Sequence, residues 1–443
     1  MRRCAGCRPL SCSFGQNRVV WIYTAPGSAA QKGEPMTRDE QNNVLIAGNR
    51  QEYGREYEFL DFSTVARASA AHAERGELLA WLRGNAEFGC CDTKVDSRRL
   101  SPGCRTCANG AWSCLFINGR CNASCFYCPT SQDETDGPLS NGIPFDTPED
   151  YAEYVALFGF AGASISGGEP LLTLDRTLAY IAAVRRRCGD AVHLWMYTNG
   201  TLLTTEIAVA LRDAGLGEIR FDIGATNYDL TKLRLAVGVI PTVTVEIPTV
   251  PEEEDLLREK LVEMAAAGVH YLNLHQMRVT PHNLRHLVSR DYTFLHGEKV
   301  TVLESELTAL RLVRYGIEQN IKLPVNYCSF PYKRRFQHAA ARRRGIPYIL
   351  GEHDIVTDVG YMRSLSTGNV QYFEAVTLPG TSNGQSVFDI MLPSGRRIVV
   401  ERRPVSPLIP VAPLFFNDFS PLTRLPDALR PYERIPVGLA DYF

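Results

Sequence analysis

The 443-residue sequence has no uninterrupted run of about eighteen apolar residues, the length that a membrane-spanning helix needs. It also has no marked excess of charge, because its 47 basic and 49 acidic residues nearly cancel. No overall field would therefore draw it to nucleic acid or to an anionic membrane. The N-terminal segment lacks the long apolar core of a secretory signal. We expect a globular, cytoplasmic protein with no membrane or nucleic-acid partner.

Cysteine, by contrast, is abundant, with thirteen residues, several of them at short spacings. Disulfides are typical of small secreted proteins and do not persist in a reducing cytosol. Clustered thiols in a long chain without a secretory signal instead favour metal binding.

Residues 1–35 are unusual in composition, and we expect them to be disordered or to precede a true start at Met36. The alternative is a zinc site made by Cys4, Cys7 and Cys12.

From Trp112 onward, short apolar runs alternate with patterns of helical spacing, which is typical of successive βα units around a parallel sheet. The sequence predicts an α/β fold, namely a barrel or partial barrel of six such units. The strands are expected at 112–118, 161–166, 191–197, 218–223, 241–247 and 269–276, and the helices at 147–159, 173–188, 202–214 and 253–267.

Two further regions flank this core, which we place at 111–328. Residues 36–110 form an N-terminal Cys-rich accessory region with a helix expected around 66–84. An amphipathic helix is expected at 301–320, and residues 329–443 form a C-terminal extension that becomes strand-like and proline-rich.

A CxxxCxxC motif follows the first expected strand, with thiols at Cys121, Cys125 and Cys128. Three thiolates on one short loop can hold three irons of a cubane and leave the fourth iron open to another ligand. Structural zinc normally takes four protein ligands, so zinc would need a distant fourth cysteine here. The motif therefore favours a 4Fe-4S cluster.

Two more motifs follow at the ends of the next expected strands: Gly167-Gly168-Glu169-Pro170, and Thr198-Asn199-Gly200. Each alone could be an ordinary turn. Together with CxxxCxxC and Tyr127, they make residues 112–280 resemble the radical S-adenosylmethionine (SAM) superfamily. That resemblance implies a partial (β/α)6 TIM-like barrel whose site lies at the C-terminal ends of the strands.

The resemblance also implies roles for single residues. Tyr127 would lie beside the SAM adenine, Gly167 to Pro170 would meet the methionyl amine, and Thr198 and Asn199 would lie near the ribose or carboxylate. Glycines permit close approach of the backbone, and a carboxylate suits an ammonium group. Further SAM contacts are expected at the ends of later strands, from Asp222, Glu246 and His275. A structural ion pair between Arg220 and Asp222, and a purely structural His275, remain alternatives.

In the superfamily, a reduced 4Fe-4S cluster gives one electron to bound SAM, and the resulting 5'-deoxyadenosyl radical takes a hydrogen from the substrate. The resemblance thus implies a radical SAM enzyme with a small-molecule or peptide substrate and an electron donor such as flavodoxin or ferredoxin. Methyl or aminocarboxypropyl transfer from SAM is an alternative, and so is a non-catalytic iron-sulfur electron-transfer or scaffold protein. Cys114, Glu246, His275 and Cys328 are unranked candidates for a later proton or hydrogen transfer.

A second metal site is expected just upstream of the cluster motif. Cys104 and Cys107 form CxxC, Cys114 follows closely, and Cys90 and Cys91 precede them. The set Cys91, Cys104, Cys107 and Cys114 suits zinc or a second iron-sulfur cluster. Alternatively, Cys114 packs in the first strand as a small hydrophobic residue and the others are free thiols.

Overall fold

The computed structural model describes residues 38–410 apart from residues 91, 132, 135–136, 338–341, 358, 367–368, 381–386 and 407. The expectations for residues 1–35, and the one for Cys91, lie outside the described residues. Every helix in the described part is too short or too polar to span a lipid bilayer.

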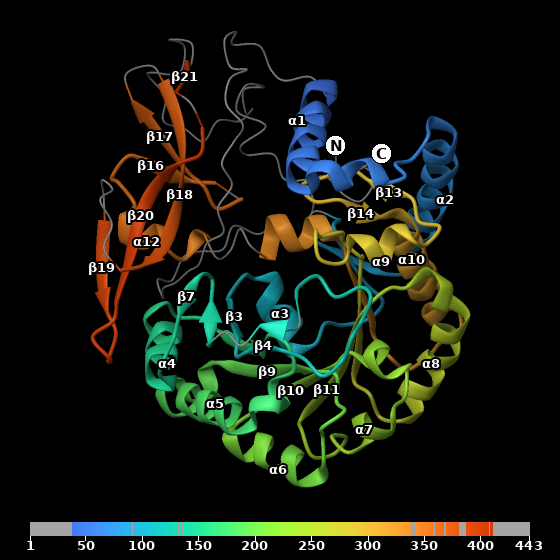
Figure 1. The fold of residues 1–443 in the computed structure, drawn as a ribbon, viewed down its shortest axis with the longest axis horizontal. Helices are drawn as coiled ribbons and strands as arrows, with labels where there is room; N and C mark the ends of the chain where they lie inside the picture. The colour runs from blue at the N-terminus through green and yellow to red at the C-terminus, as the bar shows by residue number, and fades with distance from the viewer. Residues whose placement is uncertain are drawn as a thin grey trace.

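A curved, mostly parallel sheet forms the centre of the molecule, as the sequence predicted (Figure 1). Its seven consecutive parallel strands follow the spatial order β3, β8, β9, β10, β11, β12 and β15. Their bounds are β3 (Trp112–Phe116), β8 (Gly162–Ser166), β9 (His193–Thr198), β10 (Glu218–Phe221), β11 (Thr242–Pro248), β12 (Tyr271–His275) and β15 (Val325–Cys328). The first six match the expected strands, whereas β15 adds a seventh parallel strand that the sequence did not predict.

Helices cover the outside of this sheet in chain order (Figure 1). They are α4 (Pro148–Leu157), α5 (Leu174–Cys188), α6 (Thr205–Ala214), α7 (Thr231–Arg234), α8 (Glu254–Ala266) and α10 (Leu303–Glu318). Thr147 caps α4 by accepting a hydrogen bond from the N–H of Asp150 at 3.2 Å, and Pro148 occupies the first turn. The expected helices are therefore present, with ends that differ by a few residues.

Successive residues of a strand face opposite sides, and here the two sides differ in chemistry. On β10, Ile219 and Phe221 join the hydrophobic core under the helices. Glu218 and Arg220 point the other way and are also buried. The interior of the barrel is therefore polar and charged rather than filled with aliphatic side chains.

Short antiparallel strands extend both edges of the parallel sheet. β2 (Lys94–Asp96) pairs with β15, and β1 (Glu87–Gly89) pairs with β2. At the other edge, β6 (Leu139–Ser140) pairs with β3 and with β7 (Ile143–Pro144). The N-terminal accessory region thus supplies strands to the barrel sheet itself.

Other N-terminal and late elements lie beyond one end of the barrel. These are α1 (Arg38–Tyr53), the 3-10 helix η1 (Gly54–Phe59), α9 (Leu284–Val288) and the hairpin of β13 (Phe294–Leu295) and β14 (Thr301–Val302). They share an apolar cluster that includes Tyr57, Leu287 and Phe294. The helix α2 (Val65–Arg83), close to its expected position, packs on α10, where buried Arg75 bonds Glu306 at 3.0 Å.

The C-terminal extension forms a separate antiparallel sheet beside α4 (Figure 1). Its strands are β16 (Asp354–Val356), β17 (Met362–Ser366), β18 (Asn369–Pro379), β19 (Val387–Met391), β20 (Arg397–Pro404) and β21 (Ile409–Pro410), with α12 (Ile346–Ile349) packed against it. Ser394 donates its backbone N–H to Asp150 at 2.9 Å, which joins this sheet to the barrel.

Candidate active site

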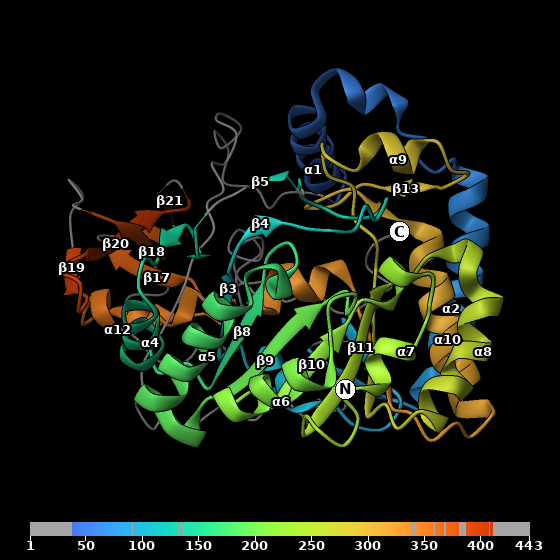
Figure 2. The ribbon, with the colours of Figure 1, turned by 60° about the horizontal axis from the view of Figure 1, so that its bottom comes forward.

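The three cysteines of the CxxxCxxC motif lie on the loop between β4 (Gly119–Arg120) and β5 (Asp133–Glu134), two short strands that Figure 2 shows beyond the parallel strands. The pairing of β4 with β5 closes the base of the loop, and all three thiols are half-buried. Burial raises the pKa of Cys121, and that of Cys125 to about 12, and the neighbouring thiols of the loop raise both further. The three sulfur atoms therefore lie close enough to interact electrostatically.

The two glycines after β8 are required by the cysteine loop itself. Gly167 has a φ of +125°, and a Cβ added at Gly167 or Gly168 would overlap the carbonyl oxygens of Asn118 and Arg120 respectively. The N–H of Gly168 donates to Asn118 at 3.0 Å, and that of Glu169 to Arg120 at 2.7 Å. The glycines thus let two backbone segments meet, and they hold the turn after β8 against the strand that leads into the cysteines.

Glu169 joins this turn to the end of β9. Its fully buried carboxylate accepts hydrogen bonds from the hydroxyl of Thr198 at 2.8 Å and from the N–H of Asn199 at 2.7 Å. The Asn199 amide in turn donates to Asn122 at 2.8 Å and lies 3.7 Å from the Cys121 sulfur. All three sequence motifs are therefore joined by hydrogen bonds, although the Glu169 carboxylate faces protein donors rather than the loop surface.

Tyr127 is held by Asp222 at the end of β10. The Tyr127 hydroxyl donates to Asp222 at 2.9 Å, and the N–H of Gly224 donates to the same oxygen at 3.1 Å. Burial raises the pKa of Asp222 to about 6, opposed by the bond from Tyr127 and reinforced by the charge of Glu246. These two predicted site residues thus contact each other directly.

Glu246 and His275 form a second group, deeper in the barrel. Glu246 contacts His275 Nε2 at 2.8 Å and accepts from Arg220 at 2.5 Å and from Asn273 at 2.9 Å. The other ring nitrogen of His275 contacts the ammonium of Lys333. Burial lowers the pKa of His275 to about 4, and the adjacent ammonium lowers it further, so the ring is neutral at pH 7.

Arg220 does not form the ion pair with Asp222 that the sequence left open as an alternative. It bonds Glu218 at 2.8 Å in addition to Glu246. The fully buried Glu218 also accepts from His193 at 3.0 Å and from the N–H of Gly103 at 2.9 Å. Despite the burial, these contacts lower the pKa of Glu218 to about 2, so an ionised carboxylate ties α3 (Pro102–Ala108) to the start of β10.

A set of thiols lies in the same interior. Cys104 and Cys107 on α3 and Cys328 at the end of β15 are buried, and they line one cavity together with Glu246 and His275. The sequence predicted the first two as metal ligands, but it did not connect them with Cys328.

The fourth predicted ligand, Cys114, lies in β3, where its thiol bonds Ser164 and Ser166 and burial raises its pKa to about 11. It does not line the cavity that Cys104, Cys107 and Cys328 share. The structure therefore separates Cys114 from the two CxxC thiols.

The donor chemistry at the cysteine loop fits an iron-sulfur cluster. No three or more Cys, His, Asp or Glu side chains in the described residues stand ready as a coordination sphere, so the thiols would rotate to close on a metal. The loop does supply three half-buried sulfurs. The N–H of Ala123, at 3.5 Å, and the amide of Asn199 both point at the Cys121 sulfur. Such N–H to sulfur bonds tune cluster-bearing thiolates.

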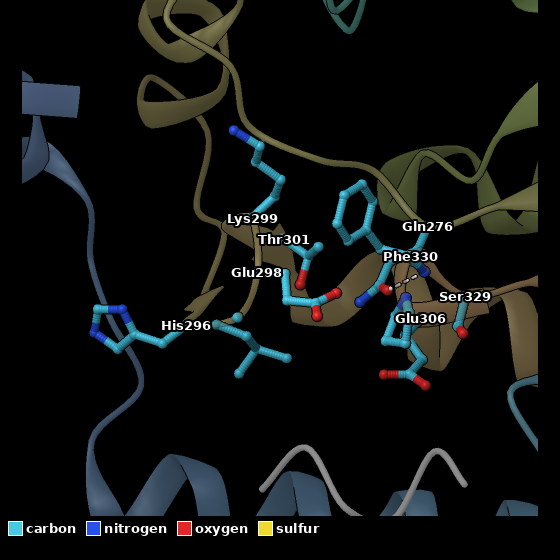
Figure 3. A pocket seen from close by; sticks show the side chains of 11 residues that line it. Gln276, His296, Glu298, Lys299, Thr301, Glu306, Ser329 and Phe330 are labelled. Atoms are coloured by element: carbon cyan, nitrogen blue, oxygen red, sulfur yellow. Dashed lines mark hydrogen bonds between the residues drawn. The ribbon is translucent and has the colours of Figure 1, made fainter. Parts of the chain in front are cut away.

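A pocket opens beyond the ends of β12 and β15 (Figure 3). Gln276 accepts a hydrogen bond from the N–H of Phe330 at 3.1 Å on one side, and the β13–β14 hairpin with His296 and Glu298 forms the other. The adjoining segment is bound to the cysteine loop, because the Thr280 hydroxyl donates to the Pro129 carbonyl at 3.0 Å. No motif marks this pocket, because the segments that form its walls carry none.

A parallel barrel with a three-cysteine loop at one end defines a class of enzymes that use an iron-sulfur cluster. Residues 115–247 match the family model described as the Radical SAM superfamily. These residues form a radical SAM domain, the domain of a superfamily of enzymes, and the superfamily implies a 4Fe-4S cluster and SAM as cofactors.

Three comparisons place it among relatives. It is 27% identical over 276 residues to a candidate glycyl-radical enzyme activating enzyme of Methanocaldococcus jannaschii, covering 60% of this chain and 72% of that protein. It is 34% identical over 118 residues to the GTP 3',8-cyclase of Synechococcus sp., covering 25% of this chain and 33% of the cyclase. The radical SAM methyltransferase TsrM of Kitasatospora setae is 17% identical over 42% of each chain, with a TM-score of 0.29, a likeness too weak to indicate a shared reaction.

Proposed function

We propose that this enzyme cleaves SAM reductively on a 4Fe-4S cluster held by Cys121, Cys125 and Cys128, and that the resulting radical takes a hydrogen from a small-molecule or peptide substrate. The observation that carries the proposal is the hydrogen-bonded path from Cys121 through Asn199 to Glu169. This path joins the three motif loops at the C-terminal ends of the strands, where barrel active sites are built.

When bound, the cluster would supply one electron and SAM the adenosyl group, and the protein would supply binding and orientation. The residues proposed to meet SAM are Tyr127, Gly167, Gly168, Glu169, Pro170, Thr198, Asn199, Asp222, Glu246 and His275. Since the carboxylate of Glu169 already accepts protein hydrogen bonds, its backbone and that of the two glycines are the groups left to meet the amine of SAM.

Tyr127 and Asp222 would act as a unit that orients the adenosyl group. The bond between them fixes the side chain of Tyr127, which also contacts the thiol of Cys125. Buried Asn283 also holds the Tyr127 carbonyl at 3.1 Å. Because both its hydroxyl and its backbone carbonyl are held, the ring of Tyr127 has little freedom to move. A fixed aromatic ring is well suited to stack against the ring of a ligand.

The substrate is proposed to enter the pocket beside Gln276 and Phe330 (Figure 3). Its wall includes the acidic Glu298 and basic Lys299, so a substrate with polar groups would fit. The similarity to a candidate glycyl-radical enzyme activating enzyme supports testing a protein or peptide as well as small molecules. The electron donor is proposed to be a flavodoxin or a ferredoxin. The proposed core is 111–328, with 36–110 and 329–443 as the accessory region and the extension.

The test is anaerobic reconstitution with iron and sulfide, followed by SAM and dithionite and by detection of the nucleoside product. We expect 5'-deoxyadenosine from the wild type and none from the variant with all three loop cysteines replaced by alanine. Cys188→Ala, a change at another half-buried thiol, is the matched control and should retain the product. Cleavage by the triple variant would refute the cluster assignment, and 5'-methylthioadenosine in place of 5'-deoxyadenosine would show that a different carbon-sulfur bond breaks.

A further inference from the structure

Three elements from distant parts of the chain bring thiols together inside the barrel. Cys328 ends β15, and the strand register places it between His275 on β12 and Lys94 on β2. Cys104 and Cys107 come from α3, whose first turn is tied to the start of β10. All three thiols line the same cavity.

A fourth thiol approaches from the turn between β1 and β2. Cys90 packs against the apolar cluster that contains Cys107, Cys328 and Tyr332. Its backbone has a φ of +52°, a value that residues other than glycine rarely adopt. The hydroxyl and the N–H of Thr93 both hold the Cys90 carbonyl, at 2.7 and 3.3 Å. Backbone strain held in place by its surroundings concentrates at functional sites.

The sulfur atoms are surrounded by hydrogen-bond donors. The ammonium of Lys94 lies 3.0 Å from the Cys328 sulfur, and the amide of Asn326 lies 3.4 Å from it. The Cys107 sulfur receives the hydroxyl of Tyr332 at 3.4 Å and the amide of Gln337 at 2.6 Å. An ammonium has no lone pair, so the Cys328 sulfur must be the acceptor. Several donors around one sulfur are typical of metal-bound thiolates.

The buried positive charge of Lys94 also favours metal-bound thiolates at this position. Its side chain is 2% exposed, rests over the Tyr332 ring at 4.8 Å, and forms no salt bridge with a carboxylate of the described chain. A buried ammonium needs a nearby negative charge. A divalent ion held by four thiolates carries a net negative charge and would supply it.

The helix that delivers two of these donors is itself unusual. Tyr332 and Gln337 are the first and last residues of a π-helix, η6 (Tyr332–Gln337). π-helical turns are rare and occur frequently at functional sites. Here the wider turn carries both side chains to Cys107.

Four thiolates in a tetrahedron are a ligand set that suits a single zinc or iron ion. We infer that Cys90, Cys104, Cys107 and Cys328 bind one zinc or iron(II) ion through four thiolates, at a site separate from the radical cluster. Like the thiols of the cysteine loop, these four would rotate to close on the ion, because no group of three or more ligands among the described residues stands ready to hold one. This set keeps the CxxC pair expected from the sequence and takes Cys90 and Cys328 in place of Cys114, while Cys91 lies outside the described residues.

Such an ion joins the β1–β2 turn, α3 and β15, so it fastens the accessory region to the interior of the barrel. The four ligands span a large stretch of chain, since Cys90 precedes Lys94, which is itself 234 residues from Cys328. Metal bound only in the folded state adds its binding free energy to folding. Loss of the ion should therefore lower stability as well as metal content.

The first experiment counts metals and acid-labile sulfide in reconstituted wild type and in the Cys121→Ala/Cys125→Ala/Cys128→Ala variant. The inference expects about one zinc or iron per chain in the triple variant without sulfide, in addition to the 4Fe-4S content of the wild type. Sulfide with several irons in the triple variant would show a second cluster and overturn the single-ion site. Absence of bound metal would overturn it entirely. Neither result depends on whether the wild type cleaves SAM.

The second experiment identifies the ligands in the triple-variant background. Cys328→Ser and Cys104→Ser should each lose most of the bound metal, whereas Cys114→Ser should retain it. Lys94→Met should weaken metal affinity about 10- to 100-fold, as loss of an outer partner of a ligand does. Retention in Cys328→Ser, or loss in Cys114→Ser, would overturn the assignment.

If the cysteine variants do not fold, X-ray absorption at the metal edge of the triple variant gives the answer without changing the site. Four sulfur ligands at about 2.3 Å are expected for zinc. Three or fewer sulfurs would refute the four-thiolate site.

Discussion

Replacing Asp222 with asparagine should make stability less sensitive to pH, even though the change removes a charge from the proposed SAM site. Asp222 is largely buried, and burial raises its pKa to about 6, against about 3.9 in an unfolded chain. The folded protein therefore binds this proton more tightly than the unfolded chain does. Its free energy of unfolding falls as pH rises from about 4 to above 6.

The size of the effect follows from the shift. About 2 pKa units correspond to about 3 kcal/mol, and partial exposure of the side chain reduces this to about 2 kcal/mol. An asparagine oxygen can still accept from Tyr127 and from Gly224. Loss of the bond from the N–H of Ala225 adds a penalty that does not depend on pH. The useful quantity is therefore the difference in the free energy of unfolding between variant and wild type, and how that difference changes with pH.

The assay is urea unfolding of both proteins without cluster or SAM, between pH 4 and pH 7.5, followed by tryptophan fluorescence. As pH rises from 4 to 7.5, we expect the free energy of unfolding of the variant to increase by about 2 kcal/mol relative to that of the wild type. Asp229→Asn is the matched control, because Asp229 is exposed and its bonds with Thr231 lower its pKa, so the trend should be small and opposite. A difference that stays flat for Asp222→Asn would refute the raised pKa.

Two further predictions concern the supports of the site. Gly168→Ala should abolish stable cluster incorporation, measured by iron and sulfide content, because the new Cβ overlaps a backbone carbonyl; Gly137→Ala, where a Cβ meets nothing within 4 Å, should bind iron normally. Glu218→Gln should destabilise the protein by about 1.5–3 kcal/mol at pH 7, since it removes one of the two carboxylates that bond the buried Arg220 guanidinium. The pKa of Glu218 is lowered to about 2, so the stability that its charge contributes is lost as pH falls. The difference in the free energy of unfolding between wild type and variant should therefore shrink below about pH 4.5, and a difference that does not change with pH would contradict the ion pair.

The barrel could be predicted because its outer face obeys simple periodicity. Apolar residues such as Ile219 and Phe221 alternate along the strands and face the helices, so the runs are visible in the sequence. The seventh parallel strand, β15, could not be predicted in this way. It is only four residues long, and two of the four, Asn326 and Cys328, are polar or reactive groups that face the barrel interior.

The motifs predicted which residues meet, but not how they meet. Glu169 is expected to meet the amine of SAM, and the structure shows that its carboxylate also ties the ends of β8 and β9 together through Thr198 and Asn199. The thiols show the same limit. Cys104 and Cys107 were expected to share a site with Cys114, which is close in sequence. In the structure they line a cavity with Cys328 and Lys94, whose strands lie toward the opposite edge of the sheet from the strand of Cys114. Sequence distance is a poor guide where a parallel sheet curves around a shared interior.

Glu246 interacts electrostatically both with Asp222 near the cysteine loop and with the inner thiols. Its charge raises the pKa of Asp222 on the side of the cysteine loop and that of Cys104 on the side of the inner thiols. Its carboxylate is fixed by Arg220 and His275, so it cannot turn away from either neighbour. Charges act over longer distances in a buried, weakly screened interior than at a surface. A change of charge at the inner thiols, such as binding of a metal ion, therefore alters the electrostatic setting of Glu246 and, through it, the group that holds Tyr127 beside the cysteine loop.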